Sequence, residues 1–173
     1  ELMGGRDAFI GKLDSLFTAD SKLEGESTSV DISGLIGQYA HGNEPSHHIA
    51  HLYNYVGQPW RTQEIVDEVL HTLYFNNPDG LSGNEDCGQM SAWYILNAMG
   101  FYQVCPGKSV YSIGRPLFNE ATVHLKDGKS FKVIAHNNSR DNKYVRSIVL
   151  NGNKLETPFF THQDIVDGGT LEL

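Results

Sequence analysis

Acidic and amide side chains gather in two glycine-containing segments, residues 41–51 and 79–89. Each segment contains a Gly-Asn-Glu triplet, and each leads into an expected helix. Such loops present backbone N–H groups and acidic side chains at one point. If the two helices are neighbours, Glu44, Glu85 and Asp86 share one site. Paired carboxylates can do the acid and base work of glycoside hydrolysis, and carboxylates with amide carbonyls are also ligands for calcium.

These residues also have simpler explanations. Acidic residues in the first turn of a helix are stabilised by the helix dipole and need no further role. His47 and His51 are four residues apart and could bind zinc, although the His-Glu-x-x-His motif is absent. Cys87 and Cys105 could form a disulfide in an oxidising compartment, or Cys87 could be an activated thiol at a helix start. Free buried thiols are the third possibility.

The positions of these loops depend on the helices around them. Apolar residues recur at helical spacing in four segments. The expected helices cover roughly 6–18, 46–56, 59–73 and 90–98. Ser46 is the expected N-cap of the second helix, and Gly57 ends it. Pro59 suits the first turn of the third helix, and Gly100 suits the C-terminus of the fourth.

After Pro106 the apolar period changes from 3.6 to 2, which indicates strands. Two alternating segments flank the turn 126–129 as a hairpin, a further strand covers Val145 to Leu150, and a last strand ends the chain. The sequence therefore predicts an α+β fold. Residues 1–105 form its helical part and residues 106–173 form a β-rich, antiparallel, sandwich-like segment.

The composition excludes several classes of function. The chain has 173 residues, of which 39% are hydrophobic, and 13 basic against 21 acidic residues give a formal charge of −8. This acidic balance argues against nucleic acid or an anionic membrane surface as the main partner. No apolar run approaches the roughly 18 residues of a membrane span. Two cysteines are too few for a disulfide-rich scaffold or a four-cysteine zinc site.

Two long motifs point to a family. They are GNEPSHHIAHLYNY at residues 42–55 and GLSGNEDCGQMSAWY at residues 80–94, with Pro59 and Thr62-Gln63 between them. Together they resemble glycoside hydrolase family 92, the calcium-dependent exo-α-mannosidases, most of which cleave α-1,2 linkages. The resemblance implies an inverting enzyme in which an N-terminal β-sandwich joins an (α/α)6 barrel. This chain would then be the last helices of that barrel followed by the closing β segment.

The resemblance also implies roles for individual residues. The last acid of the Asn-Glu-Asp run matches the general base that activates the attacking water. Asn84 stands where some members carry a second acid. The first Asn-Glu pair matches the motif associated with calcium. The expected site comprises catalytic Asp86 and Glu85, metal ligands Asn43 and Glu44, and sugar-binding His47, His48, Gln63 and Gln89.

Several expectations concern the rest of the enzyme. The general acid and the sandwich wall of the sugar pocket would lie upstream of this chain, so the isolated chain should lack mannosidase activity. A partial barrel exposes apolar faces, which makes a homodimer of the fragment possible. Family membership implies a periplasmic or secreted location and a mannose-containing glycan as substrate. The alternatives are a non-catalytic carbohydrate-binding module that uses the β segment, and a zinc hydrolase that uses His47 and His51.

Overall fold

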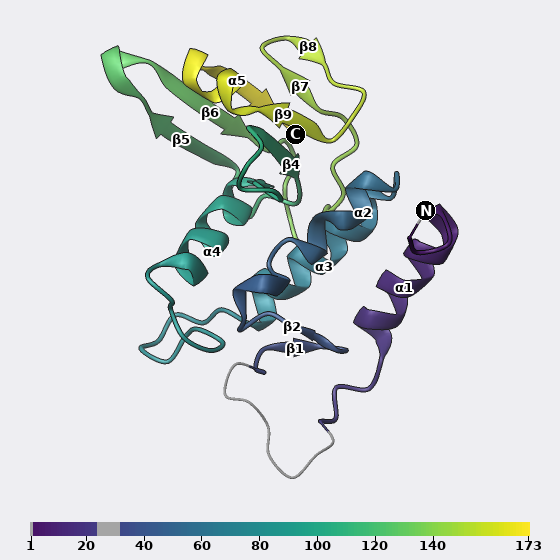
Figure 1. Ribbon diagram of the computed structural model, residues 1–173. Helices are drawn as coiled ribbons and strands as arrows, with labels where there is room; N and C mark the ends of the chain where they lie inside the picture. The colour runs from purple at the N-terminus through teal and green to yellow at the C-terminus, as the bar shows by residue number, and fades with distance from the viewer. Residues whose placement is uncertain (1, 24–31) are drawn as a thin grey trace.

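The computed structural model describes residues 2–23 and 32–173 and confirms the α+β class (Figure 1). Its helices are α1 (Arg6–Thr18), α2 (Leu52–Tyr55), α3 (Pro59–Thr72), α4 (Gln89–Met99) and α5 (His162–Asp167). The short 3-10 turns are η1 (Glu44–Ser46), η2 (Ile49–His51) and η3 (Lys126–Gly128). Within the described ranges, no helix has the length and apolar character needed to cross a membrane.

Within the described residues, ten short strands form three sheets. The first sheet pairs β1 (Leu35–Ile36) with β2 (Tyr39–Ala40). The second has the order β3 (Phe101–Tyr102), β4 (Val110–Ile113), β9 (Phe159–Thr161). The third has the order β5 (Glu120–His124), β6 (Ser130–Ile134), β10 (Gly169–Glu172), β7 (Val149–Leu150), β8 (Asn153–Lys154). The β segment is not wholly antiparallel as predicted, because β10 runs parallel to β6.

Three of the four predicted helices are confirmed. Helix α3 begins at Pro59, and α4 ends at Gly100, whose φ of 103° is accessible chiefly to glycine. The helix expected over 46–56 is wrong in type, because η1, η2 and the four-residue α2 replace it. Ser46 does not cap it but lies inside η1, where its amide bonds to the carbonyl of Asn43. Pro45 lies in the first turn of η1, where its missing N–H needs no partner.

The predicted hairpin β5–β6 is confirmed, but two other parts of the β segment differ from expectation. Only residues 149–150 of the predicted strand 145–150 pair in a sheet, because the amide of Val145 bonds instead to Gln63 of α3. Helix α5 was not predicted. Thr161 and Asp164 form a capping box at its start, a signal that the sequence contained.

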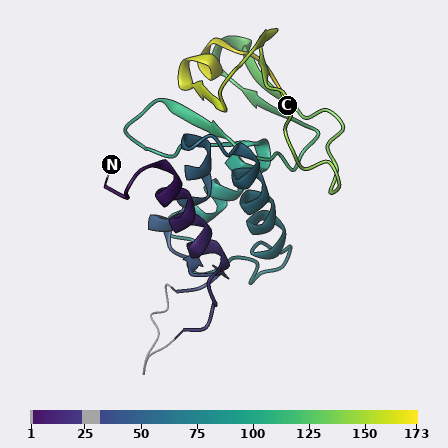
Figure 2. The ribbon, with the colours of Figure 1, turned by 90° about the vertical axis from the view of Figure 1, so that its right-hand side faces the viewer.

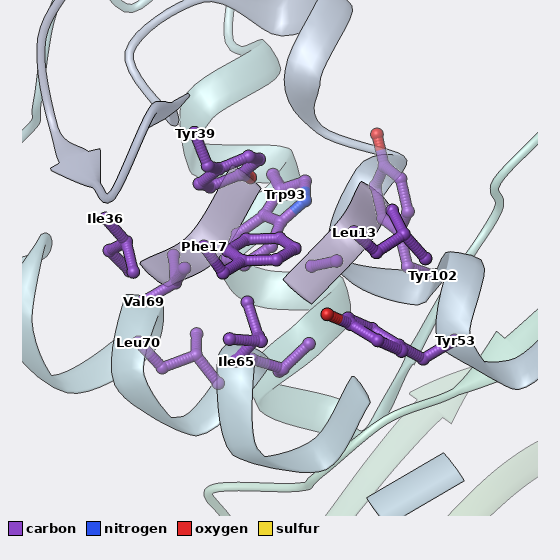
Figure 3. Close-up of a cluster of buried hydrophobic side chains, with 12 residues drawn as sticks. Leu13, Phe17, Ile36, Tyr39, Tyr53, Ile65, Val69, Leu70, Trp93 and Tyr102 are labelled. Carbon is purple, nitrogen blue, oxygen red and sulfur yellow. The ribbon is translucent and has the colours of Figure 1, made fainter. Parts of the chain in front are cut away.

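The N-terminal helices and the C-terminal strands gather in two parts of the molecule (Figure 2), and each part has its own apolar cluster. The first gathers side chains from α1, the β1–β2 hairpin, α3 and α4 around Trp93 (Figure 3). The second lies among the sheets and the C-terminal strand. Because side chains alternate along a strand, Tyr102 joins the first cluster and Phe101 the second. Strand β3 thus connects the helical and β-rich parts, and the division at residues 105–106 stays a prediction.

Candidate active site

The two polar segments lie against each other at one end of the helical layer. A Cβ atom on Gly42 would lie 2.7 Å from the carbonyl oxygen of Ser82, and one on Gly83 would lie 2.7 Å from the carbonyl oxygen of Gly42. No side chain fits at either position. In Figure 1 the loop before α4 and the β1–β2 hairpin lie at the end of the helical layer that is remote from the second and third sheets. The two Gly-Asn-Glu triplets therefore start from one point of backbone contact.

The second segment makes a left-handed turn just before α4. Asp86, Cys87 and Gly88 have consecutive positive φ values of 49°, 57° and 94°. Non-glycine residues adopt this conformation at a cost of about 1 kcal/mol or more each, and such strain concentrates at functional sites. The turn leaves Asp86 exposed, and its carbonyl accepts a hydrogen bond from the amide of Gln89. The strained backbone thus presents the expected general base to solvent.

The carboxyl groups of Asp86 and Glu44 lie near each other where the two segments meet. A hydrogen bond with Glu44 raises the pKa of Asp86 above its ordinary value, and partial desolvation and the charge of Glu44 add to this effect. Among the described residues, neither carboxylate forms an ion pair with a lysine, arginine or histidine. Two acids placed together without a cationic partner can share a proton or bind a cation.

Glu85 has a different environment from Asp86. Its carboxylate accepts hydrogen bonds from the amide of Ser91 at 3.0 Å and from the Ser91 hydroxyl at 2.9 Å. Its backbone carbonyl accepts the amide of Met90. Both Ser91 and Met90 belong to the first turn of α4, whose amides have no partner within the helix. Glu85 therefore caps α4, while the adjacent Asp86 faces Glu44.

The residues at the Glu44–Asp86 pair suit calcium in their chemistry. Carboxylate oxygens and the amide oxygen of the neighbouring Asn43 are the hard donors that calcium prefers. Calcium takes about six to eight oxygen ligands. In the parts of the chain that the structure covers, no three His, Cys, Asp or Glu side chains gather as a complete metal cage.

His47 of the first segment and Gln89 of the second are joined by a hydrogen bond between their side chains. His47 is buried, and its Nε2 donates to the carbonyl of His41 at 3.0 Å. Its Nδ1 must then accept from the amide of Gln89, which lies at 3.2 Å. Burial lowers the pKa of His47, so the ring is neutral near pH 7. Both ring nitrogens are occupied within the protein, which suits a supporting role better than direct contact with a sugar.

His51 is also fully engaged by protein groups. Its Nε2 donates to Asn97 Oδ1 at 2.8 Å, and its Nδ1 accepts from the hydroxyl of Ser112 at 3.1 Å. Burial lowers the pKa of His51 to about 4. The ring nitrogens of both His47 and His51 therefore have hydrogen-bond partners within the protein. A zinc site needs a free ring nitrogen on each histidine, so the geometry gives the zinc alternative no support.

The remaining predicted site residues lie in different surroundings. His48 is half-buried between η1 and η2. Gln63 lies on α3, where its carbonyl accepts the amide of Val145, so its contact is with the β-rich part rather than with the two polar segments. Cys87 and Cys105 are both free and exposed, so neither the disulfide nor the buried thiol is found.

The sequence did not indicate three further residues beside the site, Tyr39, His41 and Tyr74. Tyr39 Oη lies 2.8 Å from His41 Nδ1, and Tyr74 Oη lies 2.6 Å from His41 Nε2. Burial, reinforced by the nearby His47, lowers the pKa of His41 to about 3. The two tyrosines looked like ordinary core aromatics, and only the place of His41 inside the first polar segment could have pointed to this cluster.

Known proteins resemble the whole chain. The family description "Glycosyl hydrolase family 92 catalytic domain" matches residues 1–173. An alpha-mannosidase of family GH92 from Bacteroides thetaiotaomicron, solved in complex with mannoimidazole, is 44% identical with a TM-score of 0.90 over 97% of this chain. An inverting mannosidase of the same family and species is 43% identical with a TM-score of 0.83 over 99% of this chain. An uncharacterized secreted glycosidase from Arthroderma benhamiae is 30% identical over 99% of this chain.

These matches cover only part of each relative. The chain spans 22% and 24% of the two mannosidase chains and 20% of the fungal glycosidase. Within that span the match is continuous, and it includes both polar segments and the β-rich part. The chain therefore belongs to glycosyl hydrolase family 92, as a portion of its catalytic domain.

Proposed function

We propose that this chain carries the general base and part of the calcium site of an inverting exo-α-mannosidase that removes terminal mannose, with α-1,2 linkage, from glycans. The observation that carries the proposal is the close backbone contact of the two polar segments at Gly42 and Gly83, which brings Asp86 near Glu44. The relatives support the substrate class, since two are described as mannosidases and one was solved with mannoimidazole.

Asp86 can act as a base because it is exposed and faces another anion. Its carboxylate can accept a proton from a water molecule that attacks the anomeric carbon, while a separate acid protonates the leaving oxygen. In an inverting enzyme the acid and base lie about 6.5–9.5 Å apart to leave room for that water. Glu85, whose carboxylate is bound to Ser91, orients the turn that carries Asp86.

Asn43 and Glu44 would hold the calcium, together with ligands from sugar hydroxyls, water or other parts of the enzyme. A bound dication offsets the repulsion between Glu44 and Asp86 and favours the ionised base. His47 and Gln89 keep the two segments in place, and His48 and Gln63 are assigned to the sugar only through the family motif.

The decisive experiment replaces Asp86 by asparagine in the full-length protein. Asparagine tolerates the left-handed conformation, so the change removes the proton acceptor and keeps the backbone. We expect kcat on α-1,2-mannobiose to fall by about 10²- to 10⁴-fold. The matched control is Asp127→Asn, because Asp127 is an exposed aspartate with a positive φ of 60° in the distant β5–β6 hairpin.

The outcomes separate the two classes of function. Loss of turnover in Asp86→Asn alone supports the hydrolase. Sugar binding without turnover in the unmodified full-length protein supports a carbohydrate-binding module instead. Equal activity of Asp86→Asn and Asp127→Asn contradicts the assignment of the base.

The proposal extends to the context of the chain. In this proposal the general acid and a β-sandwich lie elsewhere in the enzyme, which the chain's short coverage of its relatives supports, so the isolated chain should not turn over α-1,2-mannobiose. Turnover at the rate of the full-length protein would contradict this. Exposed apolar residues such as Phe75 and Ile95 favour self-association of the isolated chain, which light scattering can measure. A periplasmic or secreted location agrees with the description of the fungal relative as secreted.

A further inference from the structure

A directed chain of hydrogen bonds joins His41 of the first polar segment to the first turn of α4. Tyr74 Oη lies 3.2 Å from the carbonyl of Met90 and 2.6 Å from His41 Nε2, and Tyr39 Oη lies 2.8 Å from His41 Nδ1. Only one proton arrangement makes all three bonds at once. Tyr74 donates to the carbonyl of Met90, so His41 Nε2–H donates to Tyr74, and Tyr39 must donate to the bare Nδ1 of His41.

A second branch connects the same two segments. His47 donates to the carbonyl of His41, and Gln89 donates both to His47 and to the hydroxyl of Tyr102 at 3.2 Å. The indole of Trp93 donates to the carbonyl of His47 at 3.0 Å. The rings of His41 and His47 stack with centroids 4.8 Å apart. The donor and the acceptor of each of these hydrogen bonds are thus assigned, and Tyr39, His41, His47 and Trp93 are buried.

The two branches end on the backbone beside the acidic pair. On one side they hold His41, which lies two residues before Asn43. On the other side they hold Gln89 and Met90 in the first turn of α4. The amides of these two residues bond to the carbonyls of Asp86 and Glu85, so the same turn of helix fixes the left-handed turn. A shift of α4 relative to His41 would move Asp86 away from Glu44.

We propose that the network of Tyr39, His41, Tyr74, His47 and Gln89 is the positioning device of the site and sets the distance between Asp86 and Glu44. These residues touch no reacting atom and act through the two backbone segments. The inference rests on the proposed function for its catalytic consequence, but the mechanical connection between the segments stands apart from the reaction catalysed. Polar groups that support catalytic or metal-binding residues in this way commonly change activity by about 10- to 100-fold when removed.

The test is Tyr74→Phe in the full-length protein. The change removes one oxygen atom and with it both hydrogen bonds of that hydroxyl. Tyr111→Phe is the matched control, because Tyr111 also pairs its hydroxyl with a histidine, His162 Nδ1 at 3.1 Å, but does so in the β-rich part. Gln89→Met has an analogous control in Gln103→Met, since the amide of Gln103 also makes two bonds, to the carbonyls of Lys108 and Pro106.

Two readouts are required. We expect Tyr74→Phe and Gln89→Met to lower kcat on α-1,2-mannobiose by about 10- to 100-fold with KM unchanged, because substrate binding is retained while the base is misplaced. Hydrogen exchange should become faster in both segments, residues 41–47 and 86–92, and in neither control. The controls should keep wild-type kcat.

Unchanged kcat in a folded Tyr74→Phe protein overturns the proposal, as does an equal loss in Tyr111→Phe or faster exchange in only one segment. If Tyr74→Phe does not fold, Tyr39→Phe removes only the outer donor and should give a smaller loss of the same kind; no loss there also overturns it. If the unmodified protein has no mannosidase activity, the proposed function fails, and the exchange experiment still decides whether the network connects the segments.

Discussion

Replacing Gly42 by alanine tests the contact between the two polar segments. The new methyl group would lie 2.0 Å from the hydroxyl oxygen of Ser33 and 2.7 Å from the carbonyl oxygen of Ser82. The serine hydroxyl can rotate away, but the carbonyl belongs to the backbone and must move. Overpacking of this kind costs about 1–3 kcal/mol. The cost falls on the contact itself, because φ at Gly42 is not in the left-handed region.

The expected result is local opening of the contact. The backbone amide of Gly42 donates to the carbonyl of Ser33 at 3.0 Å, and the backbone amide of His41 donates to the carbonyl of Gly34 at 3.0 Å. A loss of about 1–3 kcal/mol accelerates hydrogen exchange at these amides by about 5- to 150-fold. Gly107→Ala is the control, because its Cβ would meet no atom within 4 Å, and its exchange should match the unmodified protein. Unchanged exchange in Gly42→Ala would refute the close contact of the segments.

Three further outcomes are expected in the full-length protein. His51 is neutral when folded, with a pKa of about 4 against 6.5 ordinarily, so this residue alone should lower stability by about 1.4 kcal/mol per pH unit as the pH drops from 6.5 towards 4, and the buried His41 and His47 should add to the fall. His51→Gln should flatten this dependence of the melting temperature on pH, and an unchanged slope would contradict the assignment. Glu85→Gln should lower kcat far less than Asp86→Asn, because the Glu85 carboxylate is bound to Ser91; equal losses would make both acids catalytic. Chelation should abolish turnover and calcium should restore it, whereas restoration by zinc alone would favour the histidine-based alternative.

The sequence predicted the long helices well because their stability comes from simple apolar stripes. The apolar positions of α1 and α3 recur every three or four residues, and Pro59 and Gly100 mark helix ends by their backbone geometry. The stretch from 44 to 55 has a similar stripe, but it forms short turns in which the polar side chains of His47, His51 and Asn54 are buried. The spacing of apolar residues alone does not show where such a segment forms short turns instead of one helix.

The strands were predicted less completely for a related reason. Residues 145–148 have strand-forming side chains, yet the amide of Val145 finds its partner in Gln63, far away in the sequence. The parallel pairing of β10 with β6 depends on the crossover through α5, and the Thr161–Asp164 capping box was the only local sign of that helix.

The site was partly predictable from repeated motifs. The two Gly-Asn-Glu triplets indicated a shared site; the structure brings Gly42 and Gly83 of these triplets into close contact, and the catalytic role of their acids stays a prediction. The different environments of Glu85 and Asp86 could not be predicted, because they depend on the left-handed turn at residues 86–88. Tyr39 and Tyr74 have no sequence signature that separates a hydrogen-bonded tyrosine from one that only packs.

In the proposed mechanism Glu44 and Asp86 act as one unit, and a double-mutant cycle measures the coupling between them. The values of kcat/KM on α-1,2-mannobiose would be measured for the full-length enzyme, Glu44→Gln, Asp86→Asn and the double variant. When two residues act as a unit, the first substitution removes most of their joint effect. The double variant should therefore have about the same kcat/KM as the less active of the two single variants. Losses that multiply in the double variant, as for two independent sites, would contradict the claim.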